Sequence, residues 1–183
     1  MKKVIAALAL IIGTATATTA QNVTYVGGEA MYPKKDIVDN AVNSKDHTTL
    51  VAAVQAAGLV ETLKSKGPFT VFAPTNDAFE NLPAGTVETL VKPENKGTLT
   101  AILTYHVVAG NYTSDKIVKA IKASSNGIAK LTTVQGGTLK AMLNGKNVML
   151  EDENGNKANV TILDVVQSNG VIHVIDAVVT PKN

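Results

Sequence analysis

Apolar residues in the first half of the chain recur with the spacing of a helix. In "DHTTLVAAVQAAG", residues 46–58, they fall at i, i+1, i+4 and i+7, at Leu50, Val51, Val54 and Ala57. This spacing places them on one face of a helix. Asp46 is positioned to cap the start of the helix and Gly58 to end it. The segment therefore predicts an amphipathic helix.

Further helical patterns follow as far as Gly127. "LVETLKSKGP" continues the helical spacing until Gly67-Pro68, and Pro93 separates the short "TVETLV" turn from a helix over residues 94–107. "SDKIVKAIKASSNG" predicts another helix, opened by Ser114 and closed by Gly127. The apolar faces of the last two helices are Leu99, Ile102 and Leu103, and Ile117, Val118 and Ile121.

After Gly127 the pattern changes to short segments rich in Val, Ile, Leu and Thr. Four turn candidates separate them: Gly136-Gly137, Asn144-Gly145, Asn154-Gly155 and Asn169-Gly170. Asn-Gly is typical of type I′ hairpin turns, which need positive φ at both central residues. The pattern predicts an antiparallel meander of about five strands. The last, "VIHVIDAVV", is apolar on both faces and should lie centrally in a covered sheet. Helices followed by hairpins indicate a single α+β domain.

All three phenylalanines, Phe69, Phe72 and Phe79, fall within "GPFTVFAPTNDAF". "FTVFA" has the pattern of a short strand that Pro74 ends, so the first two rings point to opposite faces. A helical turn, "TNDAFENLP", then returns Phe79 towards the strand. The segment predicts a strand-to-helix corner held in the core by aromatic rings.

The helical turn at this corner opens on three residues that can cap it: Thr75, Asn76 and Asp77. If Asp77 is the cap, Glu80 occupies the capping-box position. The Thr75 hydroxyl is also the nearest analogue of a strained nucleophile, although capping explains it without chemistry. The chain has no cysteine, no G-x-S-x-G segment and no glycine-rich phosphate loop. These features do not predict an enzyme.

The chain opens like a secretory signal peptide. Lys2 and Lys3 precede the apolar run "VIAALALII" and the small residues of "GTATATTAQ", which is the order of such a leader. The nine apolar residues are too few to span a bilayer, since about 20 are needed. We expect cleavage near Ala17 or Ala20 and a product that is secreted or periplasmic.

Composition argues against several classes of partner. Removing residues 1–20 leaves 15 of the 17 positive residues against 15 acidic ones, so the product is near neutral. Every positive residue is a lysine, so the planar fork with which arginine binds phosphate is missing. Nucleic-acid binding is therefore not predicted. Without cysteine, packing alone must hold the remaining 163 residues (183 minus 20), which suffice for one domain with a core.

Three motifs carry a resemblance to a known family. "TVFAPTNDAF" (Thr70 to Phe79), "YHVV" (Tyr105 to Val108) and "NGVIHVIDAVVTP" (Asn169 to Pro181) stand in this order and spacing. They resemble the first conserved box, the central Tyr-His motif and the second conserved box of the fasciclin-like domain. The resemblance covers residues 36–181 and predicts a fasciclin-like domain there. Together with the leader it divides the chain into a signal peptide over 1–20, an N-terminal extension over 21–35 and that domain over 36–181.

This resemblance implies an α+β fold, a wedge of two β-sheets packed at a steep angle. Helices from the first half of the chain would lie against one side, and the C-terminal meander would complete the sheets. The two boxes would lie next to each other in the core. The implied role is extracellular adhesion or matrix interaction, as expected for a secreted bacterial single-domain member.

The Tyr-His motif, Tyr105 and His106, supports two interpretations. In some fasciclin-like relatives it is linked to receptor binding, which implies a partner-binding role here. His106 lies at i+7 from Leu99 and aligns with Ile102 and Leu103, a spacing that favours a buried, hydrogen-bonded histidine. Tyr105 is about 100° round the helix and could reach a partner at the edge of that stripe.

His173 and Asp176 lie on opposite faces of the last strand. The carboxylate is expected to be a hydrogen-bonded structural group. The three histidines show no metal-ligand spacing, so neither a metal site nor a cofactor is predicted. "DENGNK" resembles a calcium loop but carries Lys157 where glycine is needed and Leu163 where glutamate is needed. A hairpin turn is the better interpretation.

The sequence favours a secreted, non-enzymatic protein-interaction or cell-adhesion module, whose partner is an extracellular or cell-surface protein or glycan. The alternative is a small-molecule or polysaccharide binding protein that uses a cleft between helices and sheets. Tyr25, Tyr32 and Tyr112 discriminate between them. A shared concave patch of these tyrosines would favour ligand binding, whereas scattered positions would favour adhesion.

Overall fold

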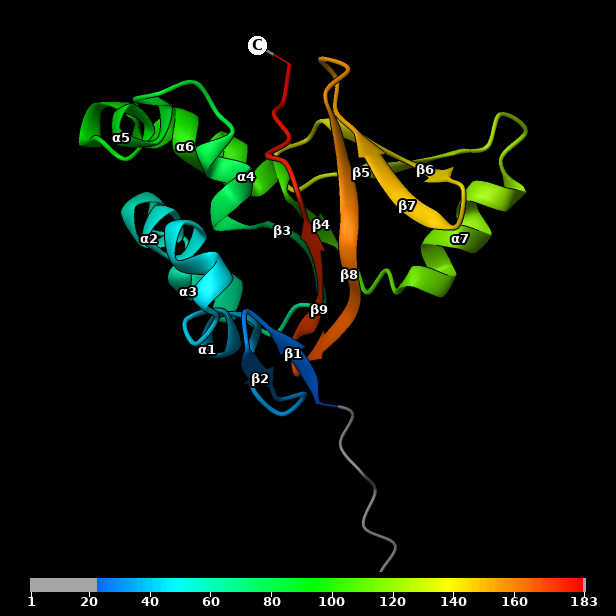
Figure 1. The fold of residues 1–183 in the computed structure, drawn as a ribbon, viewed down its shortest axis with the longest axis horizontal. Coiled ribbons are helices and arrows are strands. Elements are labelled where there is room, and N and C mark those ends of the chain that lie inside the picture. Colours follow the sequence, from blue (N-terminus) through cyan, green and yellow to red (C-terminus); the bar gives the residue numbers. More distant parts are fainter. Residues whose placement is uncertain (1–22, 183) are drawn as a thin grey trace, which may run out of the picture.

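Helices dominate the first half of the chain and strands the second, as the residue pattern predicts. The computed structural model describes residues 23–182 (Figure 1); the predicted signal peptide lies outside them. The helices are α1 (Ile37–Ala41), α2 (Thr48–Ala57), α3 (Val60–Lys64), α4 (Asn76–Glu80), α5 (Thr86–Leu90), α6 (Lys96–Tyr105) and α7 (Ser114–Ala123). The strands are β1 (Thr24–Val26), β2 (Glu29–Met31), β3 (Phe69–Pro74), β4 (Val107–Ala109), β5 (Ile128–Thr132), β6 (Thr138–Asn144), β7 (Asn147–Glu151), β8 (Lys157–Gln167) and β9 (Gly170–Ile175).

Seven of the strands within residues 23–182 form one sheet, in the order β4-β3-β9-β8-β7-β6-β5. Strands β5 to β9 follow one another as the predicted antiparallel meander. The last strand then pairs in parallel with β3, and every one of its residues is buried. This confirms its central position, although β9 ends at Ile175 and so stops before Asp176.

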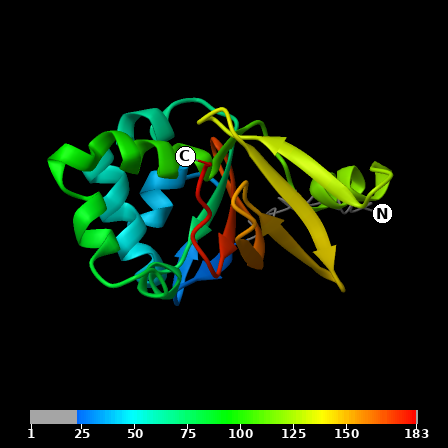
Figure 2. The same ribbon diagram turned by 90° about the horizontal axis from the view of Figure 1, so that it is seen from above.

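The long strand β8 bends this sheet into a wedge. Its first residues pair with β7 and the rest with β9, with a register shift between Ile162 and Val165. Within that shift Asp164 has a left-handed φ of 57°. Irregularities of this kind bend a strand and increase its twist, so the two halves of the sheet diverge steeply (Figure 2). A bridge between Val108 and Thr133 joins the opposite ends of the sheet. The predicted α+β wedge is confirmed.

Alternation along the central strands divides the interior into two apolar clusters. Val71 and Ala73 of β3 face the helices, whereas Phe72 faces the inside of the wedge, which α7 covers (Figure 1). We call the first the helix-side cluster; it includes Leu50, Val54, Leu63, Phe79, Leu99 and Leu103. We call the second the wedge cluster; it includes Phe72, Tyr105, Ile117, Leu139, Leu150 and Ile175.

The helix at 46–58 ends where the sequence predicts but begins differently. Gly58 adopts a left-handed φ of 73° and ends α2, a conformation that glycine adopts without strain. Asp46 lies instead in a short 3₁₀ turn, Lys45–His47, so the prediction that it caps the helix is wrong. A side chain from another part of the chain takes this role, as described below.

A turn lies at or next to each of the four predicted positions, but the bounds and the geometry differ from the type I′ expectation. Gly145 and Gly155 have φ values of 63° and 86°, whereas within residues 23–182 Asp164 is the single non-glycine residue with positive φ. The asparagines before these glycines therefore do not occupy the first position of a type I′ turn. Between β8 and β9 the connection is Ser168-Asn169 rather than Asn169-Gly170, because Gly170 already pairs with β3.

The predicted N-terminal extension contributes a two-stranded hairpin, β1 and β2. Val26 and Met31 are buried in the helix-side cluster, so the hairpin packs on the domain. On the other face of the hairpin, Tyr25 and Tyr32 are exposed to solvent. Over the described residues, no helix has both the length and the apolar character that crossing a bilayer requires.

Candidate functional site

The two segments that carry the fasciclin-like boxes lie side by side at the centre of the molecule. Strands β3 and β9 pair in parallel with Phe72 opposite His173, and these rings stack with centroids 5.6 Å apart. The backbones approach so closely at Gly170 that an added Cβ would collide with the Phe69 carbonyl. The boxes therefore build the interior of the protein.

His173 is buried and held by two backbone groups. Its Nε2 lies 2.8 Å from the Tyr112 carbonyl, and its Nδ1 accepts a hydrogen bond from the Asp164 N–H at 3.2 Å. These partners fit a neutral ring with its proton on Nε2. Burial lowers the pKa of His173, and the Tyr112 carbonyl and the Asp164 carboxylate partly oppose this effect. The ring serves as a structural hydrogen-bonding group.

The polar residues after β3 divide the capping roles between two helices. Thr75 caps its own helix, because its Oγ1 accepts a hydrogen bond from Ala78 N at 3.3 Å. Asn76 instead caps α2: its Oδ1 accepts from Thr49 N at 3.0 Å, and its Nδ2 donates to the Lys45 carbonyl at 2.8 Å. Asp77 is exposed and does not cap α4. The capping-box alternative with Glu80 therefore does not hold.

Asp164 caps a second helix from a distance, a role that no pattern in the sequence indicates. Its carboxylate accepts hydrogen bonds from both the backbone N–H and the hydroxyl of Ser114, at the start of α7. The register shift in β8 brings this side chain to the helix, so the irregular strand also fixes α7. A carboxylate at a helix N-terminus is additionally favoured by the helix dipole.

Tyr105 is fully buried in the wedge cluster. Its hydroxyl donates to the Thr138 carbonyl at 2.8 Å. Burial raises the pKa of Tyr105 to about 12. The phenol therefore links the end of α6 to β6 as a neutral group.

His106 is also buried and lies between a carbonyl and an amide. Its Nδ1 is 2.9 Å from the Ile102 carbonyl, and its Nε2 accepts a hydrogen bond from Val179 N at 3.2 Å. Burial lowers the pKa of His106 to about 4, although the Ile102 carbonyl and Asp152 oppose the shift. Because neither side chain of the Tyr-His motif reaches the surface, direct partner contact through this pair has no support in this arrangement.

Two carboxylates near the C-terminus have structural partners. Asp176 lies exposed just beyond β9 and accepts from the backbone and the side chain of Asn159, at 2.7 and 2.9 Å. Asp152 is buried in the turn that resembles a calcium loop, where it accepts from Asn154, Asn156 and Thr180. Burial opposes its ionisation, but these hydrogen bonds outweigh that effect and lower the pKa of Asp152. Within residues 23–182 no group of three or more His, Asp or Glu side chains is arranged to hold a metal.

Asn169, which the sequence suggested only as part of a turn, ties the helices to the sheet. Its Oδ1 accepts from Ile37 N at 3.0 Å, and its Nδ2 donates to the Leu63 and Ser65 carbonyls at 2.8 and 2.9 Å. These contacts bridge more than 100 residues of sequence, so no local pattern could have predicted them. Asparagine before glycine is also common in turns, which masked the role.

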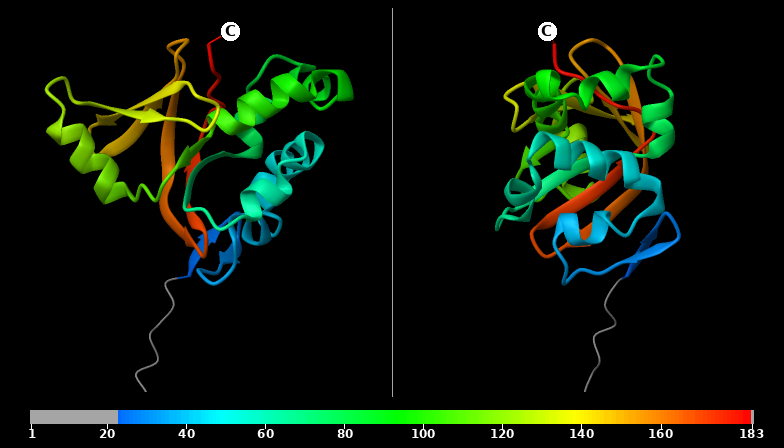
Figure 3. Two further views of the ribbon diagram at one scale, coloured as in Figure 1. Left: turned by 180° about the vertical axis from the view of Figure 1, so that it is seen from behind. Right: turned by 90° about the vertical axis from the view of Figure 1, so that its left-hand side faces the viewer.

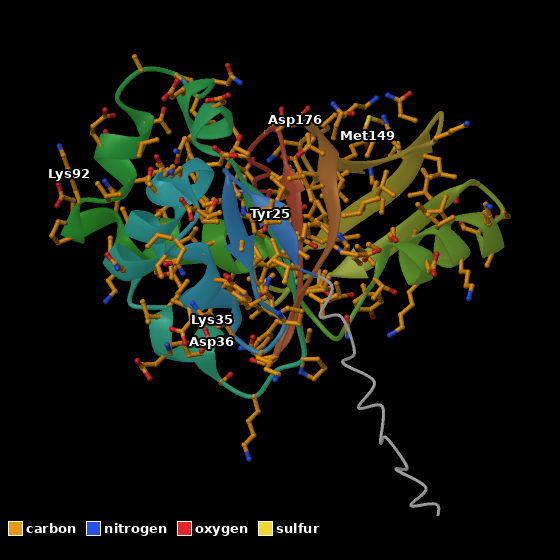
Figure 4. All side chains as sticks on the ribbon, turned by 60° about the horizontal axis from the view of Figure 1, so that its bottom comes forward. Tyr25, Lys35, Asp36, Lys92, Met149 and Asp176 are labelled. Carbon is orange, nitrogen blue, oxygen red and sulfur yellow. The ribbon has the colours of Figure 1, made fainter. Side chains whose placement is uncertain are left out.

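The three tyrosines that were expected to discriminate between functions do not share one patch. Tyr25 and Tyr32 lie on the outer face of the hairpin, with exposed fractions of 68% and 43%; Figure 4 shows Tyr25 on this hairpin. Lys35 Nζ lies 5.5 Å from the centre of the Tyr32 ring. Tyr112 is half-buried against the wedge cluster.

The protein is an α+β wedge, and the residues of its two fasciclin-like boxes pack in the interior. Residues 45–181 match the family model for the Fasciclin domain. The chain therefore belongs to the Fasciclin domain family.

Similar proteins come from bacteria and animals. The chain is 51% identical over 145 residues to Protein sll1483 of Synechocystis sp., across 79% of this chain and 73% of that protein. It is 36% identical over 149 residues to Transforming growth factor-beta-induced protein ig-h3 of Sus scrofa, across 81% of this chain but 20% of that protein. Its fold matches a FAS1 domain pair from the insect cell adhesion molecule Fasciclin I, with a TM-score of 0.71, 20% identity and coverage of 80% of this chain and 51% of that chain.

Proposed function

We propose that this protein is a secreted, non-enzymatic interaction module that binds an extracellular or cell-surface protein or glycan. The observation that carries the proposal is the burial of both fasciclin boxes. Phe72, His173 and the Tyr-His motif all make interior contacts. Recognition would then fall to the exterior, as in an adhesion protein. Family membership supports this role, since the solved relative named above is a cell adhesion molecule.

The proposed contact surface is the outer face of the hairpin. We call it the hairpin face and define it by Tyr25, Tyr32 and Lys35. Exposed tyrosines supply a large contact area at low entropic cost and are enriched at protein interfaces. Lys35, over the Tyr32 ring, adds positive charge to this face. Burial of Val26 and Met31 behind it fixes the tyrosines on a packed element.

Binding of labelled cell-surface proteins and polysaccharides to the immobilised purified protein tests the proposal. We expect saturable binding that the free protein competes away. The double variant Tyr25→Ser and Tyr32→Ser should weaken it at least about tenfold, because aromatic anchors carry most of the binding energy of interfaces. Thermal unfolding of the variant should stay within a few degrees of the parent, since both rings are exposed.

A matched control is the double variant Val91→Ser and Leu163→Ser, which removes exposed apolar side chains just after α5 and in β8. It should bind within about twofold of the parent. Equal weakening by both double variants would remove the hairpin face from the proposal. No saturable binding to any surface fraction would contradict the interaction function itself.

The proposed localisation and boundaries have a separate test. We propose export with cleavage near Ala17 or Ala20, an N-terminal extension over 21–35 and a fasciclin-like domain over 36–181. N-terminal mass spectrometry of protein recovered from the medium or periplasm should find a first residue near position 18 or 21. An intact Met1 on the recovered protein would contradict cleavage.

A further inference from the structure

A cavity of about 250 Å³ lies between the helices and the sheet. Its walls come from α1, α2 and α3 on one side and from β3 and β9 on the other, and Figure 3 (right) shows the helices that cover it. Representative lining residues are Ile37, Leu50, Val54, Leu63, Val71 and Ile172. An apolar cavity of about 150 Å³ is already large enough to bind benzene. The space is therefore large enough for a small organic molecule.

The side chains that line the cavity are uncharged and mostly apolar. No lining side chain carries a formal charge, apart from what a histidine would gain on protonation, and most are aliphatic. Val42, Gln55 and Thr62 line the cavity and are exposed, so it reaches the surface between the helices. A charged ligand would lose its hydration here without gaining an opposite charge, which is strongly unfavourable. The lining therefore selects a neutral, apolar molecule.

His47 contributes a polar side chain to this wall. The ring is 3% exposed and lines the cavity, and its Nδ1 lies 2.8 Å from Ser44 Oγ. Its Nε2 is the one buried side-chain nitrogen or oxygen without a hydrogen-bond partner among residues 23–182. Burial lowers the pKa of His47, and the nearby Ala73 carbonyl and Asp46 partly oppose this, yet Nε2 makes no hydrogen bond of good geometry. A buried, unpaired polar atom of this kind is costly.

We propose that the cavity binds a small neutral apolar molecule with a single hydroxyl, which pairs with His47 Nε2. Ser44 Oγ can donate to the imidazole or accept from it, so either neutral tautomer fits. A hydroxyl both donates and accepts, so it satisfies Nε2 in both cases. This inference does not depend on the proposed adhesion role, because the cavity and the hairpin face are formed by different side chains.

Three naphthalene probes test the proposal on the purified protein by equilibrium dialysis at pH 7.5. We expect saturable binding of 2-naphthol, with an affinity about fivefold higher than that of naphthalene because of one added hydrogen bond. Ionised 2-naphthoate should bind at least about tenfold more weakly than 2-naphthol, because its carboxylate must be desolvated. Absence of saturable 2-naphthol binding, or equal affinity for 2-naphthoate, would overturn the proposal.

Two variants locate the site. His47→Leu should abolish the preference for 2-naphthol over naphthalene while naphthalene still binds. Ala41→Leu adds volume to a lining residue of α1 and should weaken both neutral probes at least about tenfold. Ala56→Leu is the matched control, since Ala56 is exposed and does not line the cavity.

Thermal unfolding of all variants without probe separates folding from binding. A folded Ala41→Leu protein that binds like the Ala56→Leu control would overturn the assignment of the site. If either lining variant fails to fold, methyl NMR of the parent decides instead. Shifts caused by 2-naphthol should fall on Leu50, Val54 and Leu63, and shifts confined to exposed methyl groups would overturn the proposal.

Discussion

His106 illustrates how two backbone groups can fix the protonation state of a side chain. The Ile102 carbonyl needs a proton on Nδ1, and the Val179 N–H needs a lone pair on Nε2. A second proton would place a positive charge in the interior and set two donors against each other. Burial therefore lowers the pKa of His106 to about 4, and the neutral ring holds the end of the chain against α6.

This pKa predicts that the protein loses stability in mild acid. The unfolded chain binds a proton at His106 near pH 6.5, whereas the folded chain does so only near 4. Between these values the unfolded state holds more protons, so stability falls as the pH is lowered. Between pH 7 and pH 5 this one group should remove about 2 kcal/mol from the free energy of unfolding. Urea titrations at several pH values measure this change.

The variant His106→Gln isolates the contribution of the imidazole. It cannot titrate, so its stability should fall by about 2 kcal/mol less than that of the parent between pH 7 and pH 5. Burial also lowers the pKa values of His47 and His173, so some pH dependence remains in the variant. The lowered pKa of Asp152 acts below its ordinary value of 3.8, outside this range. Identical pH slopes for parent and variant would contradict the assignment.

Asn76 makes a capping contact between two distant elements, and its removal should be costly. Asn76→Ala removes the acceptor for Thr49 N and the donor to the Lys45 carbonyl. Loss of a cap costs about 1–2 kcal/mol, which we expect as a lower midpoint in urea. Asn81→Ala is the control because Asn81 is exposed, and it should change stability by less than about 0.5 kcal/mol. Equal losses in both variants would argue against capping by Asn76.

The individual site residues were predictable only where their partners are local. Burial of His106 followed from its spacing relative to Leu99, because helical period reports a face directly. The capping of α2 by Asn76 and of α7 by Asp164 joins residues 27 and 50 positions apart. Neither pair leaves a periodic pattern in the sequence. The same limit explains why Asp46 was wrongly expected to cap α2.

At the level of elements, the parallel pairing of β3 with β9 is the feature that organises the fold. The hairpin order of β5 to β9 could be predicted because each turn connects neighbours in sequence. The parallel contact joins segments about a hundred residues apart. The family resemblance predicts only that these two segments are neighbours in the core. Turn geometry was predicted wrongly because φ at the asparagines depends on how the strands pair.

Substitution of Gly170 tests whether β3 and β9 must approach each other closely at this position. In Gly170→Ala the new Cβ would meet the Phe69 carbonyl, which belongs to the rigid backbone. We expect a loss of roughly 2–3 kcal/mol or failure to fold. Gly97→Ala is the opposite control: this residue lies in α6 with open space around it, so alanine should stabilise by about 0.5–1 kcal/mol. If the thermal midpoints of Gly170→Ala and Gly97→Ala moved in the same direction, the close approach of β3 and β9 at Gly170 would be contradicted.

For the molecule as a whole, the same strands support both clusters. Val71 of β3 contributes to the helix-side cluster, and Phe72, its neighbour, to the wedge cluster. Asn169 further joins α1 and α3 to the start of β9. Unfolding the helices would uncover one face of the central strands, and opening the wedge would uncover the other. If either cluster unfolds, it exposes one face of β3 and β9, and the other cluster packs against the opposite face of the same strands.

We therefore expect the helices and the wedge to unfold in one transition. Leu139 is fully buried in the wedge cluster, and Leu139→Ala should cost about 3 kcal/mol. In urea, methyl resonances of the helix-side residues Leu50 and Leu99 should then shift their midpoints as much as those of Leu131 and Leu150 in the wedge cluster. The reciprocal variant, Leu50→Ala, should lower all four midpoints together. Midpoints that separate, so that each variant destabilises only its own cluster, would show two independent units and refute the shared role of β3 and β9.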